Sequence, residues 1–135
     1  MASHWLWRDI IHKIILLDTS SILSCFEFSI DLEGELRRLL GSYTVMIPSS
    51  VIKELEVLSN KGDGVKSRNA KASLLFIKKY DVIDVEEKNT DDSLIFLSKK
   101  IDAIVVTNDN MLRKRLKDKR QRVIFLRSKK QLEID

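Results

Sequence analysis

The sequence predicts an α/β protein in which a mainly parallel sheet of about five strands is covered by helices on both faces. Two observations lead to this prediction. Short apolar runs rich in Val and Ile alternate along the chain with longer segments of helical periodicity. The length of 135 residues suits one domain with a real core, and 44% hydrophobic with 33% charged residues is ordinary for a globular protein.

Five apolar runs are predicted as strands because each is short and rich in Val and Ile. In chain order they are Ile14–Leu17, Thr44–Ile47, Val82–Val85, Ala103–Val106 and Val123–Leu126. The first run leads directly into Asp18. A carboxylate at the end of a buried strand has to be desolvated, paired or bound to a metal ion, which makes Asp18 the first candidate functional residue.

Helical periodicity fills most of the chain between these strands. Leucines from Leu32 to Leu40 share one face before Gly41, which marks a helix end. Pro48 and the two serines after it stop a strand and cap the next helix. Further helices are expected over Ser67–Lys79, after a Thr90 cap, and after Asp109 with Met111, Leu112 and Leu116 facing the core. No strong helix start follows Asp18, and Asn60–Ser67 is predicted as a loop.

One domain, residues 1–135, accounts for this pattern, and residues 1–12 form an N-terminal extension that does not fit the alternation. Trp5 and Trp7 are expected to pack on the domain or on a second copy of the chain, as in a homodimer. No apolar run approaches the roughly 20 residues of a membrane helix, and no signal-peptide cleavage site is found. Cys25 is the only cysteine. These features favour a reducing, cytoplasmic setting with no membrane partner.

Basic residues are concentrated toward the C-terminal end of the sequence. Residues 113–130 contain ten Lys or Arg and one acid, Asp118, although the net charge of the whole chain is only +4. The rest of the chain is therefore acidic. This separation indicates a polyanionic partner held beside a cation site, while a solvated helix face with a basic tail would give the same pattern.

Acidic residues end the predicted strands or open the helices that follow them. They are Asp18, Glu54, Asp91, Asp92 and Asp109. Because ligands of open parallel sheets bind beyond the carboxyl ends of the strands, we expect these acids to meet at one edge. The helix dipole alone would favour acids at helix N-termini, but it explains Asp18 poorly. An all-oxygen cluster suits Mg²⁺ or Mn²⁺, which would neutralise the repulsion between the carboxylates.

Other phosphate-handling α/β folds lack their motifs in this sequence. The position two residues after Asp18 is Ser20, where a haloacid-dehalogenase-like phosphatase has a second Asp. The acid and lysine layout of a receiver domain is missing, and so are the glycine-rich motifs of dinucleotide-binding and P-loop proteins.

Four motifs in order resemble the PIN domain, the nuclease fold of VapC-type toxins and ribosomal-RNA processing endonucleases. They are "LLDTSS", "IPSSVIKELE", "TDDSLIFLS" and "IVVTNDNML", and the resemblance spans about Ile14 to Leu126. It implies a three-layer α/β/α sandwich around about five strands. It also implies divalent-metal-dependent hydrolysis of RNA, with either an antitoxin protein or a ribosome-assembly factor as a protein partner.

The resemblance assigns roles to individual residues. The catalytic and metal-binding acids would be Asp18, Glu54, Asp92 and Asp109, with Asp91 as a neighbour near the metal. Asp92 is preferred over Asp91 because a two-residue gap and an aliphatic residue follow the family's third acid. Thr107 and Asn108 match the polar pair before the last acid, whereas Ser20 stands where many relatives have Asn. Side chains expected to orient carboxylates or metal-bound water are Thr19, Ser20, Thr107 and Asn108, whereas capping of the following turn is favoured for Ser21.

Two functions remain open at this stage. The first is a metal-dependent endoribonuclease, either a toxin or a processing enzyme, and the presence of all four acids favours it. The second is an RNA- or protein-binding PIN module that does not cleave. In either case, the helix after Asp109 is expected to contact RNA phosphates through Arg113, Lys114, Arg115 and Lys117.

Overall fold

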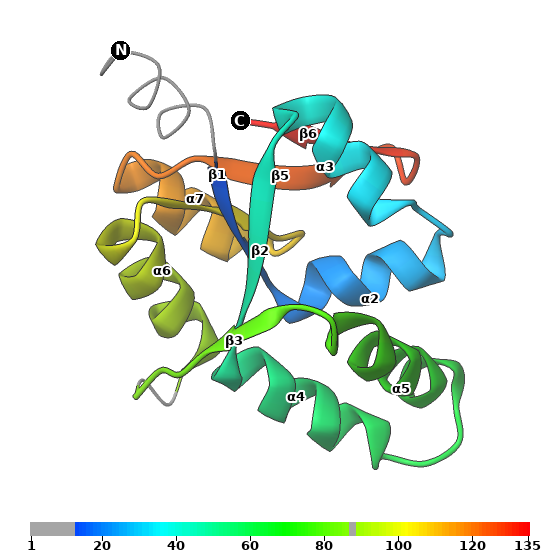
Figure 1. Ribbon diagram of the computed structural model, residues 1–135. Helices are drawn as coiled ribbons and strands as arrows, with labels where there is room; N and C mark the ends of the chain where they lie inside the picture. The colour runs from blue at the N-terminus through cyan, green and yellow to red at the C-terminus, as the bar shows by residue number, and fades with distance from the viewer. Residues whose placement is uncertain (1–12, 87–88) are drawn as a thin grey trace.

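The computed structural model describes residues 13–86 and 89–135, and within them six strands form one sheet in the order β3-β2-β1-β4-β5-β6. Figure 1 shows the sheet between two layers of helices, as expected for an α/β/α sandwich. The predicted N-terminal extension with Trp5 and Trp7 lies outside the described residues. No helix in the described part of the chain has the length and apolar character needed to span a membrane.

The five predicted strands are all present and all parallel. They are β1 (Lys13–Leu17), β2 (Tyr43–Pro48), β3 (Asp81–Ile83), β4 (Ala103–Val106) and β5 (Val123–Arg127). The central strand β1 pairs with β2 on one side and with β4 on the other. The chain thus adds β2 and β3 on one side of β1, and then β4 and β5 on the other side. The boundary between β1 and β4 is therefore the topological switch point, where parallel sheets bind ligands.

A sixth strand, β6 (Gln131–Ile134), pairs antiparallel with β5 and was not predicted. Its signal is weak because only two of its four residues are apolar. The turn before it also lacks the glycine that usually marks a tight hairpin, since Ser128 and Lys129 themselves adopt positive φ angles of 55° and 58°. The sheet therefore ends in an antiparallel edge strand beside β5.

The predicted helices are all present, but the predicted loop Asn60–Ser67 ends early because a helix already begins at Val65, and one helix was not expected. Those predicted are α3 (Leu32–Leu40), α4 (Ser49–Ser59), α5 (Val65–Ile77), α6 (Thr90–Lys100) and α7 (Asn110–Asp118). The expectation that no helix starts after Asp18 is wrong, because α2 (Thr19–Glu27) begins there with Asp18 as its N-cap. Three successive hydroxyl residues have modest helix propensity, which conceals the start that the aspartate itself provides.

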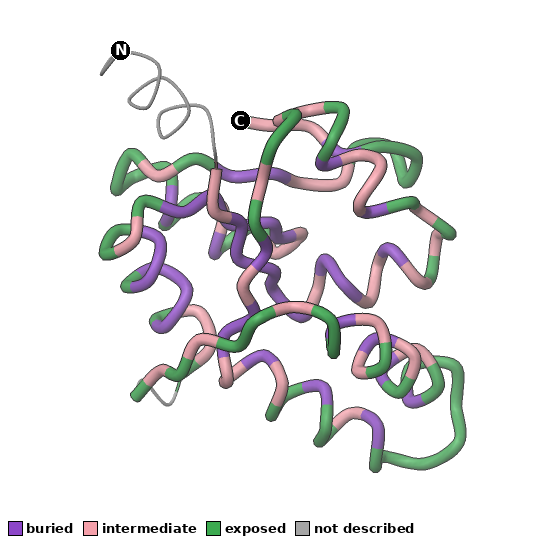
Figure 2. The backbone as a smooth tube through the Cα atoms, viewed as in Figure 1, coloured by how far each residue is buried: buried purple, intermediate pink, exposed green. Residues whose placement is uncertain are grey.

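The core is divided by the sheet into two clusters. Ile15 and Leu17 of β1 point to the face covered by α2, α3, α4 and α5, while Leu16 points to the face covered by α6 and α7. Figure 2 shows the central strands as the most continuously buried part of the chain. Met111 is 76% exposed, so its predicted core position is wrong. Leu112 and Leu116, one turn apart, fill the inner face of α7 instead.

Candidate functional site

Asp18 lies at the carboxyl end of β1, at the switch point of the sheet, and is only 4% exposed. Its backbone N–H donates to the carbonyl of Val106 at 3.0 Å, which holds it against the end of β4. Its backbone is extended, as at most helix N-caps, and its side chain accepts from the N–H of Thr19. The buried carboxylate is therefore fixed by a strand, a helix start and a neighbouring strand together.

Three donors surround the Asp18 carboxylate. Oδ1 accepts from the backbone N–H of Thr19 at 2.8 Å. Oδ2 accepts from the hydroxyls of Ser20 at 2.9 Å and Thr107 at 2.7 Å. The Ser21 hydroxyl donates instead to the Asp18 carbonyl oxygen at 2.7 Å, so Ser21 caps the turn and does not contact the carboxylate.

The two hydroxyls that face Asp18 are themselves fixed by backbone amides. Ser20 Oγ accepts from the N–H of Asn108 at 3.1 Å, and Thr107 Oγ1 accepts from the N–H of Asp109 at 3.1 Å. Because each hydroxyl oxygen already accepts an amide hydrogen, its own proton is free to point at the carboxylate. Both protons are therefore directed toward Asp18, and the loop after β4 sets their orientation.

Burial dominates the electrostatics of Asp18. Desolvation raises the pKa of its carboxyl group, the hydrogen bonds from Thr107, Ser20 and Thr19 partly oppose that rise, and the negative charge of Asp91 adds to it. The charged form of Asp18 is thus destabilised in the folded chain without a further cation. Thr19 Oγ1 is buried as well and has no hydrogen-bond partner among the described residues.

The remaining acids are arranged around Asp91, a half-buried residue in the first turn of α6. Its pKa is raised by burial first and then by the charge of Asp109, with smaller contributions from Glu54 and Asp92, while Arg115 lowers it. The negative charge of Asp91 in turn raises the pKa of Asp18. Asp91 is therefore the carboxylate that couples the acids of β1, α4 and the β4–α7 turn.

Glu54 and Asp109 are positioned by contacts at helix starts. Glu54 Oε2 accepts from the hydroxyl of Thr90 at 2.6 Å, which ties α4 to the first turn of α6. The cap of α6 is Asn89 and not Thr90, so the Thr90 side chain is left for this contact. Asp109 caps α7 by accepting from the amides of Met111 and Leu112 through Oδ1. No pattern in the sequence indicates the tether between Thr90 and Glu54.

Asp92 is exposed and pairs with a cation on α7. Its side chain is 53% exposed, and its Oδ1 lies 2.7 Å from Nη2 of Arg115 on α7. Asp91 thus has its pKa raised by neighbouring acids, whereas Asp92, the acid preferred from the sequence, is paired with Arg115. Within residues 13–86 and 89–135, the carboxylates are gathered at one edge, but no three of them stand close enough to enclose one metal ion as placed.

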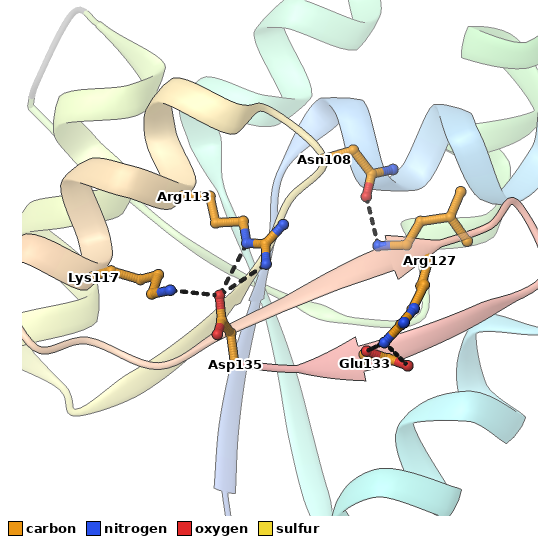
Figure 3. A network of polar contacts seen from close by, with 7 residues as sticks. Asn108, Arg113, Lys117, Arg127, Glu133 and Asp135 are labelled. Atoms are coloured by element: carbon orange, nitrogen blue, oxygen red, sulfur yellow. Dashed lines mark hydrogen bonds and ion pairs between the residues drawn. The ribbon is translucent and has the colours of Figure 1, made fainter.

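Most of the predicted RNA-contacting residues on α7 already have acidic partners. Figure 3 shows Asp135, just after β6, between Arg113 at 2.9 Å and Lys117 at 3.2 Å. Arg113 also lies over the ring of Phe125, 3.5 Å from its centroid. Arg115 pairs with Asp92, and Lys114 is exposed. Asp135 was not identified from the sequence because β6, the strand that brings it to α7, was not predicted.

Asn108 has a structural contact of its own. Its side-chain oxygen accepts from the backbone N–H of Leu126 on β5 at 2.9 Å, also drawn in Figure 3. Asn108 therefore links the loop after β4 to the next strand. It reaches Asp18 only indirectly, through its own amide and Ser20.

Comparison with known proteins identifies the fold family. The model of a PIN-like domain matches residues 15–129. Ribonuclease VapC4 of Methanocaldococcus jannaschii is 28% identical over 124 residues, covering 89% of this chain and 95% of that protein. Ribonuclease VapC9 of Archaeoglobus fulgidus is 28% identical over 123 residues, covering 91% and 90%.

Solved structures agree in fold. The PIN domain endonuclease Utp24 superposes with a TM-score of 0.73 at 20% identity, covering 90% of each chain. A domain of a functionally unknown protein from Methanocaldococcus jannaschii superposes with a TM-score of 0.61 at 21% identity, covering 86% of this chain and 92% of that one. The family model spans the whole sheet except β6, from β1 to the end of β5. The chain belongs to the PIN-like domain family.

Proposed function

We propose that the chain is a divalent-metal-dependent endoribonuclease that hydrolyses RNA phosphodiester bonds at the edge where Asp18 lies. The observation that carries this proposal is the buried Asp18 carboxylate, held by oriented donors beside Asp91 with its pKa raised. A buried charge of this kind is retained at a cost to stability, and that cost is explained if the group binds a cation. The ribonuclease names of the two relatives favour RNA as the substrate.

The donor set fits a hard cation. Asp18, Glu54, Asp91 and Asp109 offer only oxygen ligands, the type that Mg²⁺ and Mn²⁺ prefer, and the one described cysteine, Cys25, is buried among core residues beneath α2. Because the acids are gathered without enclosing a metal site, a cation would draw Asp91, Glu54 and Asp109 toward the fixed Asp18. When bound, Mg²⁺ or Mn²⁺ supplies water activation and stabilisation of the in-line phosphoryl displacement.

The residues of the chain divide the remaining work. Asp18 provides the rigid ligand, because Ser20, Thr107 and Thr19 fix its orientation. The other acids complete the site, and we propose Asp91 ahead of Asp92 as the third ligand, because Asp92 is occupied by Arg115. Asp92 then positions Arg115 at the rim. Thr19, whose hydroxyl is buried and unpartnered among the described residues, is the further candidate for orienting a water.

Basic residues of α7 are proposed to hold the RNA backbone next to this site. Lys114 is exposed, and Arg113, Arg115 and Lys117 can exchange their carboxylate partners for phosphates. Such contacts position RNA without reading its sequence. By resemblance to VapC-type toxins, we propose an antitoxin protein as the protein partner, and a small neighbouring antitoxin gene would support this assignment.

A cleavage assay tests the proposal. Single-stranded and structured RNAs are incubated with the protein in Mn²⁺, in Mg²⁺ and in EDTA, and cleavage is expected only with a metal ion. Asp18→Asn and Asp91→Asn are expected to abolish cleavage, whereas Asp92→Asn reduces it less. Glu54→Gln is compared with Glu56→Gln, which changes an exposed acid two residues further along the same helix.

The outcome separates the two open functions. Cleavage that persists in Asp18→Asn contradicts the assignment of the site. RNA binding without cleavage by the unchanged protein, in either metal ion, identifies the chain as a PIN module that does not cleave.

A further inference from the structure

A groove between α6 and α7 opens beside the acidic edge and has a different character from it. Its volume is about 430 Å³, and the residues that line it include Phe96, Lys99 and Lys100 of α6 and Arg115 and Lys119 of α7. Asp92 also lies in the groove, but its carboxylate is paired with Arg115. The lining is therefore cationic around an aromatic ring.

The helical repeat explains why these residues share one surface. On α6, Phe96 lies four residues after Asp92, and Lys99 and Lys100 lie seven and eight residues after Asp92. All four side chains therefore occupy one face of the helix. On α7, Lys119 follows Arg115 by four. Both helices begin at the carboxyl edge of the sheet, since α7 starts directly after β4 and α6 starts beside Glu54. The groove thus runs from the acids toward the opposite edge of the sheet.

Phe96 is the most informative residue of this surface. It is 50% exposed, and among the described residues it is the one aromatic side chain left largely in solvent. Its neighbours Ile95 and Leu97 are buried, so the core is already filled by adjacent positions of α6. Lys100 Nζ lies 5.5 Å from the ring centroid, which leaves much of the ring open in a cationic setting. An exposed aromatic ring among lysines is the arrangement that binds unpaired bases and their phosphates.

We propose that this groove binds the single-stranded RNA that flanks the scissile phosphate, with a base stacked on Phe96 and phosphates on Lys99, Lys100 and Lys119. The proposal rests on the proposed ribonuclease function and names its substrate class as unpaired RNA. Arg115 marks the entrance, because it contacts Asp92 next to Asp91. From Asp92 to Lys100 the helix rises about 12 Å, enough for the strand to leave the acidic edge along α6. A protein partner is less suited, since lysine is depleted in protein interfaces.

Binding measured without catalysis tests the groove separately from the active site. Fluorescence anisotropy with a labelled uridine oligomer is recorded in EDTA for the unchanged protein and for Phe96→Ala, Phe96→Tyr and Lys99→Gln/Lys100→Gln. Loss of one stacked base is expected to weaken binding by about 5- to 150-fold in Phe96→Ala, while Phe96→Tyr retains affinity because it keeps the aromatic face. The double lysine variant is expected to reduce the salt slope by about 0.7 for each phosphate that is no longer neutralised.

Matched controls come from α5 and its C-terminal end, on the other face of the sheet. Leu75→Ala removes a side chain that is 67% exposed, and Lys71→Gln/Lys78→Gln removes two exposed lysines. Neither control is expected to change affinity, and an RNA duplex is expected to bind Phe96→Ala and the unchanged protein alike. Circular dichroism verifies that each variant is folded.

The results distinguish this proposal from the proposed function. If the unchanged protein cleaves RNA but Phe96→Ala binds the oligomer normally, the groove is not the RNA path although the nuclease assignment stands. If Phe96→Ala instead lowers the mass in size-exclusion chromatography with unchanged RNA affinity, the surface is a protein interface and the proposal is overturned. If weakened binding is found in a protein that never cleaves, the groove is supported and the nuclease function fails.

Discussion

Replacing Thr107 by valine removes one hydroxyl oxygen from a fully buried position beside Asp18. The hydroxyl of Thr107 donates to Asp18 Oδ2 at 2.7 Å and accepts from the N–H of Asp109 at 3.1 Å. A hydrogen bond to a charged group contributes about 1.5–3 kcal/mol. The Asp109 amide is only partly buried, so it adds little to this loss. We therefore expect Thr107→Val to lower the free energy of unfolding by about 1.5–3 kcal/mol, a large part of a typical domain's stability.

Urea denaturation measures this loss, and Thr107→Ser is the matched control. Serine keeps the hydroxyl and removes one methyl group, which corresponds to about 1 kcal/mol. The midpoint should shift strongly for valine and weakly for serine, with the slope of the transition unchanged. Equal shifts for the two variants would refute the role given to the hydroxyl.

The pH dependence of the stability lost in Thr107→Val tests how much of that loss comes from the charge of Asp18. The pKa of Asp18 is raised in the folded chain, so the ionised carboxylate costs stability above that pKa, and the cost disappears as pH falls toward the unfolded value. The Thr107 hydroxyl reduces that cost by stabilising the ionised form. The loss caused by Thr107→Val should therefore be larger at pH 8 than at pH 4, and a loss independent of pH would contradict the argument.

Three further predictions use the same contacts. In EDTA, Asp18→Asn should gain stability relative to the unchanged protein as pH rises from 4 to 8, because only the unchanged protein ionises a buried carboxyl group over that range. Urea midpoints that differ equally at both pH values would contradict this. Asp135→Asn should tighten RNA binding, measured by anisotropy, because Arg113 and Lys117 lose their shared carboxylate. The salt slope of binding should steepen by about 0.7 for each freed cation. Asp118→Asn, which changes an exposed acid on α7, should alter neither the affinity nor the slope. Millimolar Mn²⁺ or Mg²⁺ should raise the melting temperature of the unchanged protein, by about 2.7 kcal/mol of added stability at a hundredfold excess over Kd, and calorimetry should show no such rise for Asp18→Asn.

The central part of the fold could be predicted because its signal is local and redundant. The strands around β1 are continuous apolar runs, and their helices carry leucines at regular spacing, so periodicity alone identified them. The PIN resemblance, carried by four motifs at strand and helix ends, is confirmed by the family model over residues 15–129. β6 was missed because two apolar residues and a turn without glycine give little signal.

The candidate site was less predictable, because its details depend on side-chain direction. Asp91 and Asp92 are adjacent in a helix, so about 100° of rotation decides which faces Asp109 and which faces Arg115. The sequence motif favoured Asp92, whereas the placement of the side chains favours Asp91, and the choice stays a prediction. The helix start at Asp18 was missed for a related reason, since one carboxylate acts as both cap and buried acid.

The bond between Asp18 and Thr107 joins residues 89 positions apart in the chain, and this separation has a consequence for synthesis. The first strand leaves the ribosome long before β4, so during elongation Asp18 lacks both the Thr107 hydroxyl and the Asn108 amide that orients Ser20. At about 5–20 residues per second, that interval lasts roughly 4–18 s. A nascent chain therefore carries Asp18, Glu54 and Asp91 before it has Asp109 or the contacts that hold Asp18. Under the proposed function, the site would stay incomplete next to the ribosome's own RNA until most of the sequence has been translated.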